Sequence, residues 1–220
     1  MKMVETADLC KSYTVENREI RILDQISLSV DAGEFLVIAG SSGSGKSTLL
    51  TLMSGLDRPD SGKVLIAGKE ISHLKEDELA PLRNAVFGFV FQSFHLIPSL
   101  TALENVMFPA EFRRDPEAAR KAGLLLERAG MGKRKNGFPH QLSGGEKQRV
   151  AICRALINEP KIIFADEPTG NLDSAHSRAV LDLLFELRQE KNAALVLVTH
   201  SAEIADMADR VILLRDGKIG

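Results

Sequence analysis

The chain has 220 residues, of which 44% are hydrophobic and 26% charged, with a formal net charge of −2 at pH 7. These values are ordinary for a globular protein with one substantial domain, or with a core and a smaller subdomain. The near-neutral charge gives no argument for nucleic-acid binding, which would favour a basic face. No segment approaches the roughly 18 consecutive apolar residues of a membrane helix, and the amino terminus has no signal-peptide core. We therefore expect a cytoplasmic protein that does not cross a membrane by itself.

The two cysteines, Cys10 and Cys153, are far apart and have no metal-ligand spacing. We expect them to be small buried side chains in a reducing compartment and not to form a disulfide.

The amino-terminal part of the sequence is typical of β structure. Residues 3–35 alternate in a β-like way, with a period-two strand at 26–30 followed by a turn at 31–33. Residues 64–67 form another expected strand, and Gly68 after it indicates a tight turn and a hairpin partner. These segments predict an antiparallel β layer.

A glycine-rich loop separates these β segments. It follows the apolar run 35–39 and precedes an apolar helix that Gly55 ends. The loop fits the phosphate-binding pattern G-x-x-x-x-G-K-[ST], and its residues, with the next one, are Gly40, Ser41, Ser42, Gly43, Ser44, Gly45, Lys46, Ser47 and Thr48.

The glycines of this loop allow successive backbone N–H groups to turn inward on an anion, and the helix that follows points its positive end at the same place. Lys46 can reach the β- and γ-phosphates, and the Ser47 hydroxyl can ligate the accompanying Mg²⁺. The alternative is a glycine- and serine-rich turn before an ordinary helix. The strand before the loop and the apolar helix after it favour nucleotide binding.

Between residues 93 and 158 the sequence has helical character. One helix is expected to begin with Pro116 at its first position and to end at Gly130. The preceding segment 94–100 is apolar but interrupted by Pro98. It is interpreted as buried packing or, alternatively, as an exposed docking patch.

The last third of the chain predicts a strand–helix–strand unit. Residues 161–165 and 195–198 are short apolar runs, as expected of strands buried on both faces of a parallel sheet, and 179–187 has helical spacing between them. A final strand is expected at 211–214. The first of these strands places Asp166 at its carboxyl end, where open α/β sheets bind ligands. Asp166 suits Mg²⁺, and its neighbour Glu167 can accept a proton from an attacking water.

The segment Leu142-Ser143-Gly144-Gly145-Glu146 precedes a helix at 147–156. Ser143 and Glu146 fit a capping box, which requires no function. Two glycines just inside a helix weaken it, however, and this cost is understandable if a phosphate approaches the helix N-terminus closely.

The phosphate loop, Leu142–Glu146 and Ala165–Pro168 together resemble the motifs of the ATP-binding subunit of ATP-binding-cassette (ABC) transporters, in the same order and approximate spacing. The resemblance covers essentially all 220 residues. It implies an α/β fold in a single ATP-binding domain: a RecA-like P-loop core with an antiparallel β subdomain (1–91 and 159–220), and an α-helical subdomain (92–158) that carries the signature motif.

The resemblance also implies roles for individual residues. The chain is expected to bind ATP with Mg²⁺ and to hydrolyse the ATP. The implied catalytic residues are Glu167, His200, Lys46 and Gln92, and the implied metal contacts are Ser47, Gln92 and Asp166. Nucleotide contacts beyond the loop are Tyr13, which would stack on adenine, the signature residues Ser143, Gly144 and Gly145, and Asp173 in a loop that crosses a dimer interface.

The implied partners are a second copy, which pairs head to tail on ATP binding, and an integral-membrane permease. The permease contact is expected near Phe94, His95, Leu96, Ile97 and Pro98, so the chain would lie peripherally on the inner face of the cell membrane. No nucleic-acid partner is expected. The chain looks most like the lipoprotein-releasing and macrolide-export branch of the family. A mechanical signalling subunit that controls an extracytoplasmic hydrolase without transport is the alternative.

Overall fold

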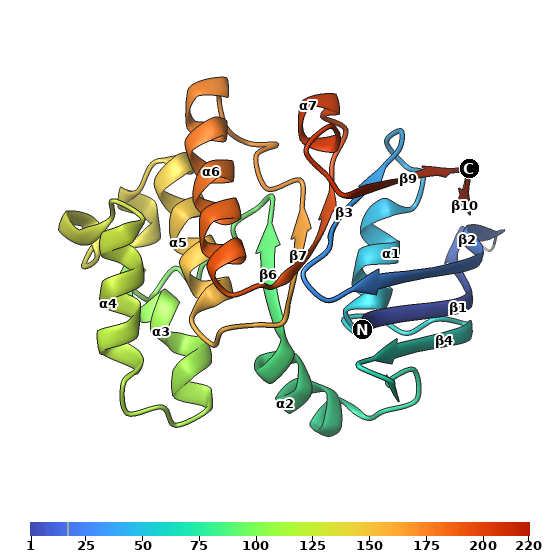
Figure 1. Ribbon diagram of the computed structural model, residues 1–220, viewed down its shortest axis with the longest axis horizontal. Helices are drawn as coiled ribbons and strands as arrows, with labels where there is room; N and C mark the ends of the chain where they lie inside the picture. The colour runs from blue at the N-terminus through green and yellow to red at the C-terminus, as the bar shows by residue number, and fades with distance from the viewer. Residues whose placement is uncertain (17) are drawn as a thin grey trace. The chain divides into compact units, whose positions relative to one another are not determined.

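The computed structural model describes residues 1–16 and 18–220, with the side chains of residues 174–176 outside that description. The chain divides into two compact units, and each is described by itself (Figure 1). The first comprises Met1–Arg83 and Ala193–Gly220, and the second comprises Asn84–Asn192. Helix α2 (Glu76–Val86) carries the chain from the first unit into the second.

An antiparallel sheet with strand order β2-β1-β4-β5 forms one layer of the first unit. Its strands are β1 (Lys2–Val15), β2 (Arg18–Asp31), β4 (Ser61–Ile66) and β5 (Lys69–Glu70). The expected strand at 26–30 is confirmed as part of a strand of 14 residues, and the strand expected at 64–67 is confirmed as far as Ile66. A tight turn at Ala67 and Gly68 joins β4 to β5, as the hairpin interpretation predicts.

Parallel strands form the other layer of the first unit. The central strand β3 (Phe35–Ala39) pairs with β8 (Ala194–Val198) on one side and with β9 (Arg210–Arg215) on the other. All five residues of β8 are buried, because a parallel strand in the middle of a sheet is covered on both faces. The short strand β10 (Lys218–Ile219) pairs antiparallel with β9.

Helices α1 (Lys46–Met53) and α7 (Ala202–Ala205) pack on the strands of the first unit. Helix α1 contacts β8, β1 and β2, and the short helix α7 contacts β3. The loop from β3 to α1 therefore begins at the carboxyl end of a buried parallel strand, which is where open α/β sheets place ligands.

The second unit is largely helical around a parallel pair of strands, β6 (Phe87–Phe91) and β7 (Ile162–Asp166). Helix α5 contacts β6 and also α3, α4 and α6 (Figure 1). The helical elements of this unit are α3 (Ala102–Phe112), α4 (Ala118–Arg128), η1 (Gly132–Arg134), η2 (Pro139–Gln141), α5 (Gly144–Leu156) and α6 (Ser174–Glu190).

Aromatic packing joins β6 to β7. The ring centroids of Phe89 and Phe164 lie 5.9 Å apart with nearly parallel planes, and Phe87 meets Phe164 edge-on at 5.4 Å. Gly88 interrupts this aromatic strand because α5 lies against it: a Cβ atom there would be 2.5 Å from the carbonyl oxygen of Ala155. Close packing of α5 on β6 thus requires glycine at position 88.

One helix start differs from the expectation. Helix α4 begins at Ala118 with Glu117 as its N-cap, so the prediction of Pro116 at the first helical position is wrong. The Asp115 carboxylate accepts a hydrogen bond from the Glu117 N–H at 2.9 Å, and this local turn holds the chain out of the helix. Gly130, with a φ of 70°, follows the end of the helix as expected.

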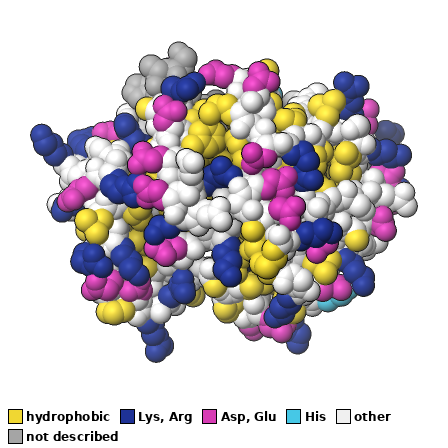
Figure 2. Space-filling view, viewed as in Figure 1, with side chains coloured by type: hydrophobic (Ala, Val, Ile, Leu, Met, Phe, Trp, Pro, Cys, Tyr) yellow, Lys and Arg dark blue, Asp and Glu magenta, His cyan; other side chains and the backbone are white. Residues whose placement is uncertain are grey.

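The face shown in Figure 2 carries Lys and Arg side chains interspersed with Asp and Glu. Among the described helices, none combines the length and the apolar character needed to cross a membrane.

Candidate active site

The glycine-rich loop follows β3 directly and ends at Gly45, the N-cap of α1. Gly45 has a φ of 99°, a left-handed conformation that favours glycine. A Cβ atom at Gly40 would lie 2.3 Å from the carbonyl oxygen of Leu214 on β9, so the loop passes too close to the neighbouring strand for any side chain. The loop thus begins at the carboxyl end of the central strand β3 and ends at the N-terminus of α1.

Lys46 is nearly buried at the beginning of α1. Its Nζ donates hydrogen bonds to the carbonyl oxygens of Gly40 at 3.0 Å and Ser41 at 2.8 Å. The ammonium group therefore lies across the loop, with its positive charge at the N-terminal end of a helix where anions are favoured.

Ser44 provides a test of whether the loop suits a phosphate. Its side chain is 4% exposed, and its Oγ has no hydrogen-bond partner among the described residues. A buried hydroxyl without a partner is costly unless a ligand satisfies it. Ser47, which follows Lys46, is exposed at the first turn of α1, and Thr48 is half-buried. Together with Lys46, this donor set fits a polyphosphate.

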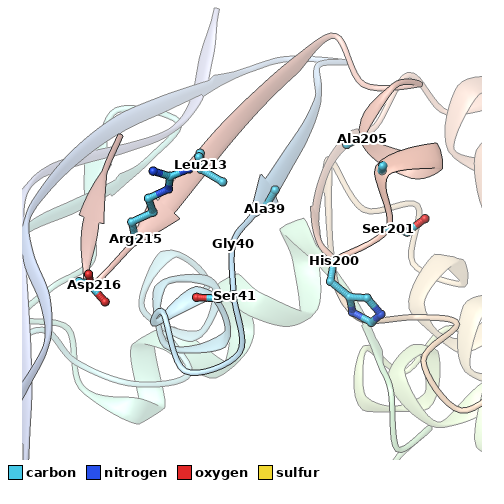
Figure 3. A pocket seen from close by; sticks show the side chains of 10 residues that line it. Ala39, Gly40, Ser41, His200, Ser201, Ala205, Leu213, Arg215 and Asp216 are labelled. Atoms are coloured by element: carbon cyan, nitrogen blue, oxygen red, sulfur yellow. The ribbon is translucent and has the colours of Figure 1, made fainter.

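His200 lies in the segment after β8 and is exposed. It lines a pocket of about 590 Å³ that also includes Gly40 and Ser41. Figure 3 shows these two loop residues between Arg215 and Asp216 on one side and His200 on the other. The structure therefore places His200 in the same pocket as the first residues of the glycine-rich loop.

Tyr13 lies on β1 in the same unit, and its side chain is 42% exposed. Its hydroxyl donates a hydrogen bond to Asp57 Oδ2 at 2.9 Å, and the Nζ of Lys11 lies 5.2 Å from the ring centroid. Burial and the hydrogen bond to Asp57 raise the pKa of the Tyr13 phenol above its ordinary value. Asp57 and Lys11 were absent from the sequence-based assignment. Asp57 is 44 residues from Tyr13 in the sequence, so no local pattern indicated that contact, whereas Lys11 lies two residues before Tyr13 on the same strand.

The expected acidic pair lies in the second unit. Asp166 is the last residue of β7, and Glu167 follows it with a φ of 43°. Both are half-buried. A left-handed conformation costs an L-residue free energy and is found preferentially where function requires a particular placement.

Gln92 comes directly after β6, whose last residue Phe91 pairs with Asp166. Its Nε2 donates to Asn171 Oδ1 at 3.2 Å, and Asn171 Nδ2 donates back to the Gln92 carbonyl at 3.0 Å. A Cβ atom at Gly170 would be 2.7 Å from Gln92 Nε2. The structure thus joins Gln92 to the segment after β7, which continues to the exposed Asp173.

The signature segment forms the start of α5 with the predicted capping box. Ser143 is the N-cap, the Ser143 N–H donates to Glu146 Oε2 at 2.8 Å, and the Glu146 N–H donates to Ser143 Oγ at 3.3 Å. Gly144 is half-buried and Gly145 buried. A Cβ atom at Gly144 would lie 3.2 Å from Leu172 Cδ2, so close packing is a second reason for glycine here.

The predicted site residues fall into two groups. Tyr13, the loop residues 40–48 and His200 belong to the first unit, while Gln92, residues 143–145, Asp166, Glu167 and Asp173 belong to the second. Among the described residues no group of three or more His, Cys, Asp or Glu side chains could hold a metal ion alone.

Comparisons with known proteins agree with these motifs. Residues 23–170 match the family model described as ABC transporter. The chain is 46% identical over 221 residues to the macrolide export ATP-binding/permease protein MacB of Rhodopirellula baltica, covering 99% of this chain and 32% of that protein. It is 50% identical over 204 residues to the lipoprotein-releasing system ATP-binding protein LolD of Aquifex aeolicus, covering 92% of this chain and 91% of that protein.

Among solved structures, the dimeric post-hydrolysis state of the ATP-binding cassette MJ0796 bound to ADP and Pi matches with a TM-score of 0.92. It is 42% identical in sequence, and the match covers 99% of this chain and 96% of that one. The α/β fold class predicted from the sequence is confirmed by this likeness. The chain spans only about a third of the length of the export ATP-binding/permease relatives it matches.

Proposed function

Because this chain belongs to the ABC transporter family, we propose that it binds and hydrolyses ATP and thereby drives a separate membrane permease. The observation that carries the proposal is the glycine-rich loop, in which the Lys46 ammonium lies across the main chain and the buried Ser44 hydroxyl has no partner among the described residues. Both groups are suited to bind the terminal phosphates of a nucleotide.

ATP is held in this proposal by residues from several segments of the chain. Main-chain N–H groups and side chains of residues 40–48 bind the phosphates, and Tyr13 stacks on the adenine. Ser47, Asp166 and Gln92 would hold Mg²⁺, which would neutralise negative charge on the phosphates.

Hydrolysis requires a water to attack the γ-phosphorus while the bond to the ADP oxygen breaks. Glu167 accepts the proton of this water, a role typically worth about 10²–10⁴-fold in rate. Gln92 orients the water and Mg²⁺, and His200 contacts the γ-phosphate. The position of His200 beside Gly40 and Ser41 supports this assignment.

Two copies of the chain are proposed to close around ATP. The relative MJ0796 is described as dimeric and bound to ADP and Pi. By analogy, Ser143, Gly144 and Gly145 of one copy would face the γ-phosphate held by the loop of the other, with Asp173 at the interface. The γ-phosphate then acts as a shared ligand, so its release allows the dimer to open.

The experiment that tests this model uses Glu167→Gln, which should still bind ATP but hydrolyse it slowly. On size exclusion with Mg-ATP the variant should elute as a dimer, and without nucleotide as a monomer. Glu159→Gln is a matched control, since Glu159 also has a positive φ and lies before the same strand β7. Identical elution of Glu167→Gln with and without Mg-ATP would contradict ATP-driven dimerisation.

The permease contact is proposed for the segment Phe94–Pro98. His95 and Pro98 are exposed, whereas Phe94, Leu96 and Ile97 are half-buried. The exposed side chains are thus available for docking, while the half-buried ones also pack against the protein. His95→Asp should therefore preserve basal ATP hydrolysis and remove its stimulation by the permease. Phe94→Asp and Leu96→Asp are expected to do the same, and their unfolding would instead favour the packing interpretation.

The lipoprotein-releasing and macrolide-export branch is the proposed place of this chain in the family, since relatives with those printed names are 44–50% identical to it. The chain would then lie peripherally on the inner face of the membrane through its permease. Residues 92–158, which contain α3, α4 and α5, are the proposed helical subdomain.

A further inference from the structure

The loop that follows α1 reaches back to β1 through a small cluster of charges. Asp57 is the centre of this cluster. Its carboxylate accepts hydrogen bonds from the Tyr13 hydroxyl at 2.9 Å, from Lys11 Nζ at 3.1 Å and from the Arg58 N–H at 2.7 Å. Three donors on one carboxylate, two of them from side chains of the same strand, make a defined site.

Lys11 and Asp60 hold the loop against the strand. Lys11 is only 8% exposed and also donates to the Arg58 carbonyl at 2.7 Å. Asp60 accepts from the Ser12 N–H at 2.6 Å, and its own N–H donates to the Cys10 carbonyl at 3.0 Å. The position of the Asp57 carboxylate relative to β1 is thus determined by several independent contacts.

We infer that Asp57 is a positioning residue for the base of the bound nucleotide, because it fixes the Tyr13 ring relative to the helix that begins with Lys46. This inference rests on the proposed function, in which Tyr13 stacks on adenine. It adds a residue that has no contact with the nucleotide itself.

The physical reason is the freedom of a tyrosine on a sheet. At 42% exposure the Tyr13 ring has room to change rotamer, and each rotamer would present a different stacking plane. A hydrogen bond from the phenol to an ionised carboxylate selects one of them. Lys11 lies over the ring, 5.2 Å from its centroid, which leaves the opposite face for a base.

The charged and titratable groups around the phenol agree with this arrangement. Burial and Asp57 raise the pKa of Tyr13, Asp60 raises it further, and the Thr48 hydroxyl on α1 opposes them. Burial alone would raise the pKa of Asp57, but Lys11, the Arg58 N–H and Tyr13 outweigh it and lower that pKa. The Asp57 carboxylate is therefore ionised at neutral pH and accepts a hydrogen bond from the Tyr13 hydroxyl.

Tyr13 can be observed without interference, because it is the only tyrosine and the chain has no tryptophan. Absorbance titration of the phenol and tyrosine emission both report on this residue alone. In Asp57→Asn the titration midpoint should fall toward the ordinary tyrosine value. Asp24→Asn, on the neighbouring strand β2, is the matched control and should leave the midpoint unchanged.

The binding test compares ATP with inorganic tripolyphosphate by calorimetry in EDTA. In Asp57→Asn, loss of the stacking geometry should weaken ATP binding by about five- to thirtyfold. Its affinity for tripolyphosphate should stay within about twofold of the wild-type affinity. Tyr13→Phe retains the ring but lacks the hydroxyl, so it should reproduce the selective loss. The double variant should be no weaker than either single variant.

Three outcomes would overturn the inference. Asp57→Asn or Tyr13→Phe could bind ATP as the wild type does, or Asp57→Asn could lose ATP and tripolyphosphate equally, which would mean that it supports the phosphate loop. If Asp57→Asn does not fold, the ATP affinity of Tyr13→Phe decides whether the inference stands. Failure of the proposed function is distinguishable: the wild type would then bind neither ATP nor tripolyphosphate, and ATP would leave wild-type Tyr13 emission unchanged.

Discussion

The guanidinium of Arg154 donates a hydrogen bond to the main-chain carbonyl of Phe94 at 2.8 Å, across 60 residues of sequence. A second hydrogen bond from the same group goes to the carbonyl of His95. Phe94 and His95 have φ values of 61° and 47°, and two consecutive left-handed residues of this kind cost of order 1–2 kcal/mol each. Arg154 on α5 thus stabilises a strained loop that directly follows Gln92.

Arg154→Lys keeps the charge but loses the planar fork that reaches both carbonyls. We expect the free energy of unfolding in urea to fall by about 1–3 kcal/mol and amide hydrogen exchange at residues 93–98 to accelerate. Arg120→Lys is the control, because Arg120 makes an exposed ion pair with Glu117 on the surface. Unchanged exchange at 93–98 would show that Arg154 does not hold this loop.

Lys46→Ala removes the ammonium that lies across the glycine-rich loop. Since charged hydrogen bonds contribute about 1.5–3 kcal/mol, ATP affinity measured by calorimetry should fall by roughly 10- to 150-fold. Lys69→Ala, on the exposed hairpin strand β5, should bind ATP as the wild type does. An equal loss in both variants would argue for general electrostatic attraction and against a specific phosphate site.

Glu146 should make stability depend on pH. The Ser143 N–H, the Ser143 side chain and Arg134 lower its pKa in the folded state below that of the unfolded chain. The stabilisation is therefore fully present above the unfolded pKa, and it is lost as the pH falls through the folded pKa.

Glu146→Gln isolates this charge, because glutamine can still complete the capping box. At pH 7 the variant should be less stable to urea by about 0.3–1 kcal/mol. The difference should shrink as the pH falls from about 5 toward 3. A difference that stays constant over this range would mean that the carboxylate charge contributes nothing.

Cys153 should resist thiol reagents in the folded protein. It is fully buried on α5, and burial raises its pKa to about 12. At pH 8 one thiol per chain, that of the half-buried Cys10, should react with a disulfide reagent, and two should react in urea. Cys10→Ser should show no fast-reacting thiol when folded. A fast second thiol would indicate that the packing of α5 opens readily.

Local patterns predicted those features that depend on neighbouring residues. The period-two and continuous apolar runs located the strands because pleating alternates side chains and parallel strands are buried on both faces. The spacing of Ser143 and Glu146 predicted a capping box that the structure contains. The predicted start of α4 was wrong because the Asp115 carboxylate accepts a hydrogen bond from the Glu117 N–H and so competes with the helix, and periodicity does not indicate such a contact.

The sequence by itself determined the glycine-rich loop, the acidic pair after a buried strand and the signature capping box, since each is a short run whose chemistry lies within a few residues. Only the tertiary structure decided that Asp57 accepts a hydrogen bond from the hydroxyl of Tyr13, 44 residues away in the sequence. The same is true of the hydrogen bonds that Arg154 donates to the loop after Gln92. Such contacts depend on which strands and helices pack together, and no spacing along the chain encodes the distance between two atoms that folding brings into contact.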